Sequence, residues 1–236
     1  MRETNRVRAF PIFAAAALLI FGLSCTARSS NKGNGTISSK MLPSPDLQSA
    51  FLQIVQKRHT SREYGDKVPD RQMLSSLLWA AYGTNRPDGK RTAPSAHDWQ
   101  YIDVYVADRV GVYRFDAKQH DLELVKAGDF RSKTGEGTAP VSLVYVSDSR
   151  KFGTDTSDEL KLLYGAATTG AIAQNVYLFC AANGLNTGVR ADIDRPTLHG
   201  AIGLAPEQKI LLAQSVGYPP ALGILKSRIK SLFARF

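Results

Sequence analysis

The chain has 236 residues and a formal net charge of +9 at pH 7, from 30 Lys and Arg against 21 Asp and Glu. Hydrophobic residues make up 43% and charged residues 22%, which is a globular composition and excludes a disordered chain. The length allows one sizeable domain or at most two small ones. Two cysteines exclude a disulfide-rich scaffold and a four-cysteine zinc site. The four scattered histidines form no HxxxH pair, so we expect no histidine-based metal site.

The first 25 residues are typical of an export signal. Arg2, Arg6 and Arg8 form a positive start, and the almost purely apolar run Pro11–Leu23 follows. That run has 13 residues, fewer than the roughly 20 that a helix needs to span a bilayer. Cys25 comes soon after it, and this order resembles a bacterial lipoprotein signal, in which the cysteine thiol is lipidated.

Two alternatives to a lipoprotein stay open. The lipoprotein pattern prefers an aliphatic residue three positions before the cysteine, and Gly22 stands there. Ordinary secretion with cleavage, or an uncleaved anchor, would also use such a segment. In each case we expect an exported protein. As a lipoprotein it would be held in the cell envelope through Cys25, facing the periplasm or the exterior.

A flexible tether is expected over residues 26–44, because they are rich in Ser, Gly, Asn and Lys and lack apolar periodicity. One domain then follows over residues 45–236. Cys180 lies in the apolar context Tyr177–Ala182 and is expected to be a small core residue and not a nucleophile. If Cys25 is lipidated, Cys180 has no cysteine with which to pair.

The domain begins with helical patterns. Ser44-Pro45-Asp46 has the residues of a helix start, and apolar residues then repeat at helical spacing up to Lys57. Asp70 is expected to begin a second helix, which Gly83 ends.

After the second helix the hydrophobic period changes to that of strands. The expected strands are Tyr101–Ala107, Gly111–Ala117, Leu122–Val125, Val141–Ser147, Leu185–Ala191 and Ile210–Gly217. Asp108–Val110 is expected to join the first two in a hairpin. A long, alanine-rich helix is expected over about 156–183 and a short one over 195–201. Helices mixed with a largely antiparallel strand set predict the α+β class.

Several common catalytic motifs are absent. Lys133-Thr134-Gly135 would suit a serine acyl-transfer enzyme, but the matching SxxK spacing occurs in the tether, at Ser29–Lys32, and no SDN follows. No GxSxG, Walker A or GxGxxG motif occurs, which disfavours a serine hydrolase, a P-loop enzyme and a Rossmann dinucleotide site. No basic run exceeds three residues, and an exported protein rarely meets nucleic acid, so we expect no nucleic-acid partner.

Four segments together have the composition of a binding site. The first, Arg58–Arg62, places two guanidinium groups four residues apart with two hydroxyls between them, a set that can hold a phosphate. The others, in chain order, are Arg91–Gln100, Gln174–Phe179 with Gly184–Arg190, and Gln214–Pro219 with Lys226–Arg228.

This order of segments resembles the FMN-dependent nitroreductase family. Within it, Leu77–Arg86 and Arg91–Ala96 are most similar to the branch of azoline-oxidising dehydrogenases that act in peptide maturation. The resemblance covers about residues 47–230. It implies a nitroreductase-like fold, with a central, mostly antiparallel sheet flanked by helices, in an intertwined homodimer. It also implies FMN, bound in a cleft at the dimer interface.

The resemblance further implies which residues would contact FMN. An RxSxR-like segment would hold the phosphate and ribityl chain, and a later basic pair would reach the same phosphate. A PSA segment would line the flavin from the partner chain, and the loop after the long helix would lie along the ring, where a backbone N–H commonly faces flavin N5. In this order the residues are Arg58, His59, Thr60 and Arg62; Lys226 and Arg228; Pro94, Ser95, Ala96 and Asp98; Val189, Arg190 and Ala191.

Two positions depart from the family pattern. Asp98 stands where the family usually has Asn, and an ionised carboxylate accepts hydrogen bonds but cannot donate one. It could accept the flavin N3–H, while it would disfavour negative charge on the reduced ring. His97 replaces a small or apolar residue. Arg190 has a structural alternative, an ion pair with Asp192 or Asp194.

The function that the resemblance implies is that of an FMN-dependent oxidoreductase. A donor such as NAD(P)H would give a hydride at flavin N5, and an electron-poor small molecule would then take the electrons in a ping-pong cycle; a peptide azoline would instead give them. This chemistry requires no catalytic side chain. The alternative is a non-catalytic envelope protein that binds a ligand or flavin on the same fold, which Asp98 and export away from NAD(P)H both favour.

Overall fold

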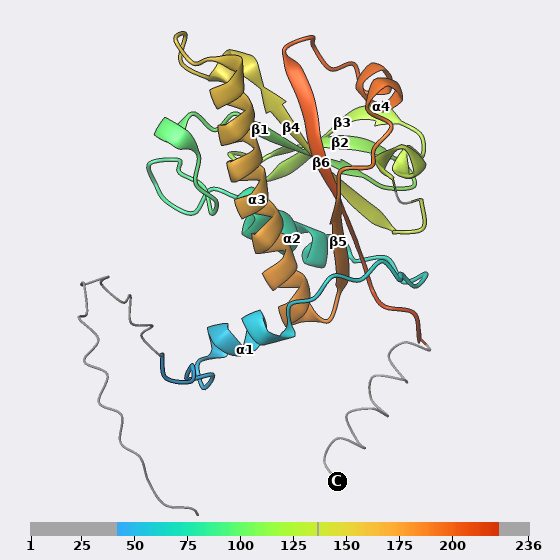
Figure 1. The fold of residues 1–236 in the computed structure, drawn as a ribbon. Helices are drawn as coiled ribbons and strands as arrows, with labels where there is room; N and C mark the ends of the chain where they lie inside the picture. Colours follow the sequence, from blue (N-terminus) through green and yellow to red (C-terminus); the bar gives the residue numbers. More distant parts are fainter. Residues whose placement is uncertain (1–41, 136, 222–236) are drawn as a thin grey trace, which may run out of the picture. The chain divides into compact units, whose positions relative to one another are not determined.

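The computed structural model describes residues 42–135 and 137–221 (Figure 1). Cys25, nearly all of the expected tether, Lys226 and Arg228 therefore lie outside the described residues.

One antiparallel sheet of six strands forms the centre of the described domain, in the order β3-β2-β1-β4-β6-β5. The strands are β1 (Ile102–Ala107), β2 (Gly111–Asp116), β3 (Asp121–Ala127), β4 (Val141–Asp148), β5 (Asn186–Arg190) and β6 (Gln208–Gly217). Each expected strand is present, and β1 and β2 pair as the expected hairpin. Together with the helices, the sheet confirms the predicted α+β class.

Helices cover both faces of the sheet. They are α1 (Ala50–Lys57), α2 (Arg71–Tyr82), α3 (Asp158–Asn183) and α4 (Arg195–Ala201). Side chains alternate along the central strands, so Leu143 and Tyr145 of β4 pack with α2 and α3, whereas Val144 and Val146 pack with α4. Figure 1 shows α3 running along one face, with α2 beside it and α1 at its C-terminal end.

The start of α1 differs from the prediction. The helix begins at Ala50, because the hydroxyl of Ser49 accepts the amide of Leu52 over 3.2 Å and so caps it. Asp46 instead accepts the amide of Gln48 over 3.0 Å in a local turn that precedes the helix.

The bounds of α2 and α3 follow the predicted signals. The Asp70 carboxylate caps α2 by accepting the amide of Met73 over 2.8 Å, and Gly83 ends that helix. Gly184 ends α3 in the left-handed conformation, with φ of 67°. Cys180 of α3 is buried, as expected, and burial raises the pKa of its thiol to about 12. Among the described residues, no helix is both long and apolar enough to cross a membrane.

Candidate functional site

The segment after α1 runs alongside β5. The amide of Ser61 donates to the carbonyl of Thr187 over 3.0 Å, and the guanidinium of Arg62 donates to the carbonyl of Val189 over 3.3 Å. Gly188 lies between these contacts, and a Cβ added there would lie 3.2 Å from Cγ of Arg62. The fold therefore brings the predicted phosphate-binding segment against the predicted ring-lining strand.

The phenol of Tyr177, on α3, holds this junction. It accepts hydrogen bonds from the hydroxyl of Thr60 over 3.1 Å and from the amide of Val189 over 3.0 Å. The guanidinium carbon of Arg58 lies 5.2 Å from the centroid of the Tyr177 ring, a cation–π distance. One buried side chain thus fixes the basic segment relative to β5.

The charges of Arg58 and Arg62 lack a carboxylate partner among the described residues, whose ion pairs involve other side chains. Thr60 and Arg62 are exposed, and so are the neighbouring Lys57 and His59. Guanidinium and hydroxyl donors without a paired acid form a site for an anion, and phosphate matches them in charge and in acceptor oxygens. This donor set fits the phosphate of FMN.

The end of β5 is tied to another loop. Nη1 of Arg190 donates to the carbonyl of Gly135 over 2.6 Å, so this guanidinium holds the loop against residues 189–191. Asp194, one of the two ion-pair partners considered for Arg190, pairs with Lys133 over 3.4 Å.

The segment Pro94–Asp98 is tied to the other end of α3. The amide of Ala96 donates to the phenol of Tyr101 over 3.2 Å. The same phenol donates to the carbonyl of Tyr164 over 3.1 Å and lies 2.7 Å from the hydroxyl of Thr168.

The two groups of candidate residues are thus tied to α3 at different positions along the helix. Tyr164 and Tyr177, their anchors on α3, are 13 positions apart, which is about 20 Å along a helix at 1.5 Å per residue.

Asp98 and His97 are exposed at the tip of this segment. The carboxylate of Asp98 accepts a hydrogen bond from the side-chain amide of Gln100 over 3.3 Å. The ring of His97 lies 4.5 Å from that of Trp99, which in turn lies 5.9 Å from Phe152. Trp99 packs against the core.

Three residues that shape the site were given no role in it from the sequence: Tyr177 and Gln100, which lie within the four candidate segments, and Tyr101, which was expected only to begin a strand. The two tyrosines occupy largely apolar, buried positions. A buried phenol usually requires a hydrogen-bond partner, and that requirement is the signal that could have found them. Lys226 and Arg228 lie outside the described residues.

Comparisons with known proteins assign the family. A model described as the nitroreductase family matches residues 55–218, which is more than half of the chain, and the chain belongs to this family. A solved structure from Ralstonia eutropha JMP134, provisionally named a nitroreductase, is 38% identical with a TM-score of 0.70. The match covers 76% of this chain and 89% of that one. The fold is therefore nitroreductase-like, and the family is one of oxidoreductases that typically use flavin.

Two further relatives extend the comparison. A protein of Methanocaldococcus jannaschii, provisionally named a nitroreductase, is 27% identical over 158 residues, which are 61% of this chain and 79% of that one. The E. coli microcin synthetase McbBCD complex with truncated pro-MccB17 bound matches with a TM-score of 0.61 and 18% identity, over 80% of this chain and 78% of that chain. At that identity the likeness shows a shared fold.

Proposed function

We propose that the chain is an FMN-dependent oxidoreductase of the nitroreductase type. The observation that carries the proposal is the pair Arg58 and Arg62, which lie beside β5 without a carboxylate partner among the described residues, in a chain of a flavin-using family. With Thr60 and His59, these residues would hold the phosphate and ribityl chain.

Bound FMN would supply the redox chemistry, by taking electrons from one substrate and giving them to another. The residues of this chain would bind and orient the reactants. Residues 189–191 would line the ring on one side, and Pro94–Asp98 of a second protomer would close the other side and exclude water. Lys226 and Arg228 would add charge at the phosphate.

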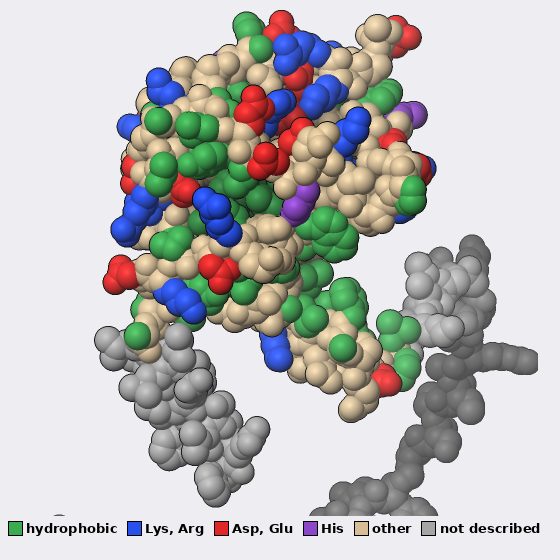
Figure 2. All heavy atoms as spheres, turned by 180° about the vertical axis from the view of Figure 1, so that it is seen from behind, with side chains coloured by type: hydrophobic (Ala, Val, Ile, Leu, Met, Phe, Trp, Pro, Cys, Tyr) green, Lys and Arg blue, Asp and Glu red, His purple; other side chains and the backbone are tan. Residues whose placement is uncertain are grey.

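A homodimer is part of the proposal. All side chains of α1 are at least partly exposed, and Phe51 is 61% exposed. Leu162 and Leu163, near the start of α3, are 59% and 60% exposed. Figure 2 shows hydrophobic side chains on the surface of the segment that carries α1. A second copy would cover such apolar surface, as in a dimer interface.

For the substrate we propose an electron-poor small molecule, such as a nitro compound or a quinone, with an azoline ring of a peptide as a variant. The fold shared with a complex that holds truncated pro-MccB17 supports the peptide variant at the level of fold alone. NAD(P)H is the donor that the family suggests, and a quinone or a redox partner would replace it outside the cytoplasm. We further propose that the chain is exported and anchored in the cell envelope through lipid on Cys25.

The test is an absorbance spectrum of the purified chain from residue 26 onward, with FMN added and then with NADPH. We expect a yellow protein whose flavin absorbance NADPH bleaches. Arg58→Ala and Arg62→Ala should each weaken FMN binding about ten-fold or more but leave riboflavin binding, which involves no phosphate, nearly unchanged. Arg109→Ala removes an exposed guanidinium from the β1–β2 turn and serves as the control.

Two outcomes would change the assignment. A protein that takes up no FMN contradicts the proposed function. A protein that binds FMN but passes no electrons from NADPH, a quinol or dithionite to an added nitro compound or quinone favours the alternative, a binding protein of the cell envelope.

A further inference from the structure

The turn that follows Ser95 has an unusual backbone. His97, Asp98 and Gln100 have φ angles of 52°, 55° and 50°, in the left-handed region that non-glycine residues seldom adopt. Among the described residues, His120 is the one other non-glycine residue with a positive φ. Such strain persists only where neighbouring contacts enforce it, and it gathers at binding and active sites.

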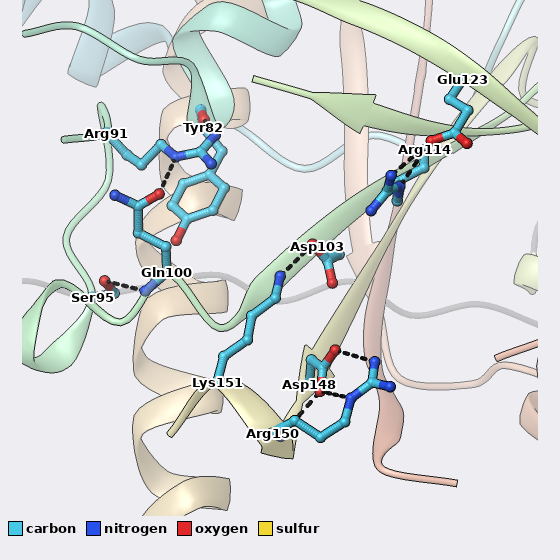
Figure 3. A network of polar contacts seen from close by, with 10 residues as sticks. All are labelled: Tyr82, Arg91, Ser95, Gln100, Asp103, Arg114, Glu123, Asp148, Arg150 and Lys151. Atoms are coloured by element: carbon cyan, nitrogen blue, oxygen red, sulfur yellow. Dashed lines mark hydrogen bonds and ion pairs between the residues drawn. The ribbon is translucent and has the colours of Figure 1, made fainter. Parts of the chain in front are cut away.

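Gln100 supplies the contacts that enforce this turn (Figure 3). Its backbone amide donates to the hydroxyl of Ser95 over 3.1 Å, and its side-chain carbonyl accepts from Nε of Arg91 over 2.8 Å. Its side-chain amide donates to the carbonyl of Gly89 over 3.2 Å and to the carboxylate of Asp98 over 3.3 Å. One residue therefore ties the tip of the turn to the loop that precedes it.

Arg91 is fixed in turn against α2. Its Nη1 donates to the carbonyl of Tyr82 over 3.2 Å, and its guanidinium carbon lies 5.0 Å from the centroid of the Tyr82 ring. Tyr82 is buried in the core. Figure 3 shows Arg91 lying between Tyr82 and Gln100. A planar guanidinium suits this position because it donates in two directions while it stacks.

Asp98, by contrast, is exposed at the tip of the turn. Among the described residues, its carboxylate has one hydrogen bond, from the side chain of Gln100. Contacts that run from the core through Arg91 and Gln100 thus hold the Asp98 carboxylate in place, while its exposed side remains open to a ligand.

We propose that Gln100, held by Arg91, is a positioning residue that keeps Asp98 in the left-handed conformation and so places its carboxylate against the flavin ring held by the facing protomer. This inference rests on the proposed function. Without the Gln100 side chain the turn relaxes toward the commoner backbone regions, and the carboxylate moves. A carboxylate at the ring opposes negative charge on reduction, so its position sets the reduction potential of the bound flavin.

The experiment combines Gln100→Gly with Asp98→Asn in the full-length chain. Glycine tolerates the left-handed φ, so Gln100→Gly removes the side-chain contacts without adding strain. In flavin-free Gln100→Gly protein, the backbone amides of residues 98–100 should exchange with solvent about ten-fold faster than in the native chain. In the FMN-loaded protein, Asp98→Asn should raise the reduction potential, and in the Gln100→Gly background that shift should fall below a third of its native value. Gln119→Gly, next to left-handed His120, is the control and should change neither measurement.

Unchanged exchange in Gln100→Gly overturns the proposal, because the turn then does not depend on this side chain. Faster exchange together with an undiminished Asp98→Asn shift also overturns it, as does an Asp98→Asn variant with the native potential. A chain that binds no flavin contradicts the proposed function and with it the flavin contact of Asp98. The exchange rates then decide separately whether Gln100 holds the turn.

Discussion

The hydroxyl of Thr60 lies 3.1 Å from the phenol oxygen of Tyr177, although the two residues are 117 positions apart in the chain. The amide of Val189 donates to the same oxygen over 3.0 Å. A single hydroxyl on α3 therefore joins the basic segment to β5. Both groups that we propose to contact FMN in one protomer donate to this acceptor, in addition to their direct contacts Ser61–Thr187 and Arg62–Val189.

Removing that hydroxyl in Tyr177→Phe should weaken FMN binding. The ring under Arg58 remains, but the amide of Val189 and the hydroxyl of Thr60 lose their acceptor. An unsatisfied, partly buried donor costs about 1–3 kcal/mol. We expect the dissociation constant for FMN, measured by titration calorimetry, to rise about ten-fold, or ~1.4 kcal/mol.

Tyr105→Phe is the matched control for this change. Tyr105 is also buried, but it lies in the cluster on the opposite face of the sheet. The Tyr105→Phe substitution should lower thermal stability slightly and leave FMN binding unchanged. Equal FMN affinity in Tyr177→Phe and the native chain would show that the hydroxyl does not organise the site.

Much of the fold could be predicted because its signals are local. Asp70 and Gly83 bound α2 through contacts within four residues of themselves, and Asp108 closes the β1–β2 turn by accepting the amides of Val110 and Gly111. The predicted start of α1 was wrong because Ser44 and Ser49 are both of a residue type that caps helices. Which of them caps depends on where the chain turns toward α3.

The site could be predicted only where its residues form a motif. Arg58 and Arg62 stand four positions apart with two hydroxyls between them, and it is this set together with the order of the other segments that indicates a phosphate site. The role of Tyr177 rests on contacts with segments 117 and 12 positions away, which no local pattern contains. The sequence gives no sign of the left-handed conformation of Gln100 either, because glutamine is not among the residue types that favour positive φ.

Gly135→Ala should destabilise the chain strongly. Gly135 has φ of 85°, and an added Cβ would overlap the backbone oxygen of Asp192, so the loop that Arg190 holds would have to move. We expect a loss of about 3 kcal/mol or more in the free energy of unfolding, measured in urea. Gly203→Ala, at φ of 65° with nothing within 4 Å of the added Cβ, should lose only about 1–2 kcal/mol. Equal losses of stability in Gly135→Ala and Gly203→Ala would contradict the close approach of Gly135 to the backbone of Asp192.

Phe51→Glu should dissociate the proposed dimer. Phe51 is 61% exposed on α1, and a charge placed in an apolar interface is costly to bury. We expect light scattering to give a monomer mass at concentrations where the native chain is dimeric. Leu124→Glu introduces the same charge at a residue of β3 that is 55% exposed, and it should leave the mass unchanged. A dimer that persists in Phe51→Glu would exclude α1 from the interface.

Asp148→Asn should make the free energy of unfolding fall less steeply as the pH is lowered into the acid range. Asp148 is buried, and the Arg150 guanidinium, 2.6 Å away, holds the pKa of its carboxyl below the ordinary value. Because the folded-state pKa is lowered, the ion pair stabilises the fold above the unfolded pKa of about 4 and loses its effect as pH falls through the folded value. We expect Asp148→Asn to lower the free energy of unfolding by about 1–2 kcal/mol at pH 7, with a difference that shrinks below about pH 4. Urea titrations between pH 7 and pH 2 measure it, with Asp155→Asn as an exposed control of equal charge. A difference that stays constant with pH would show that the ionised carboxylate contributes nothing.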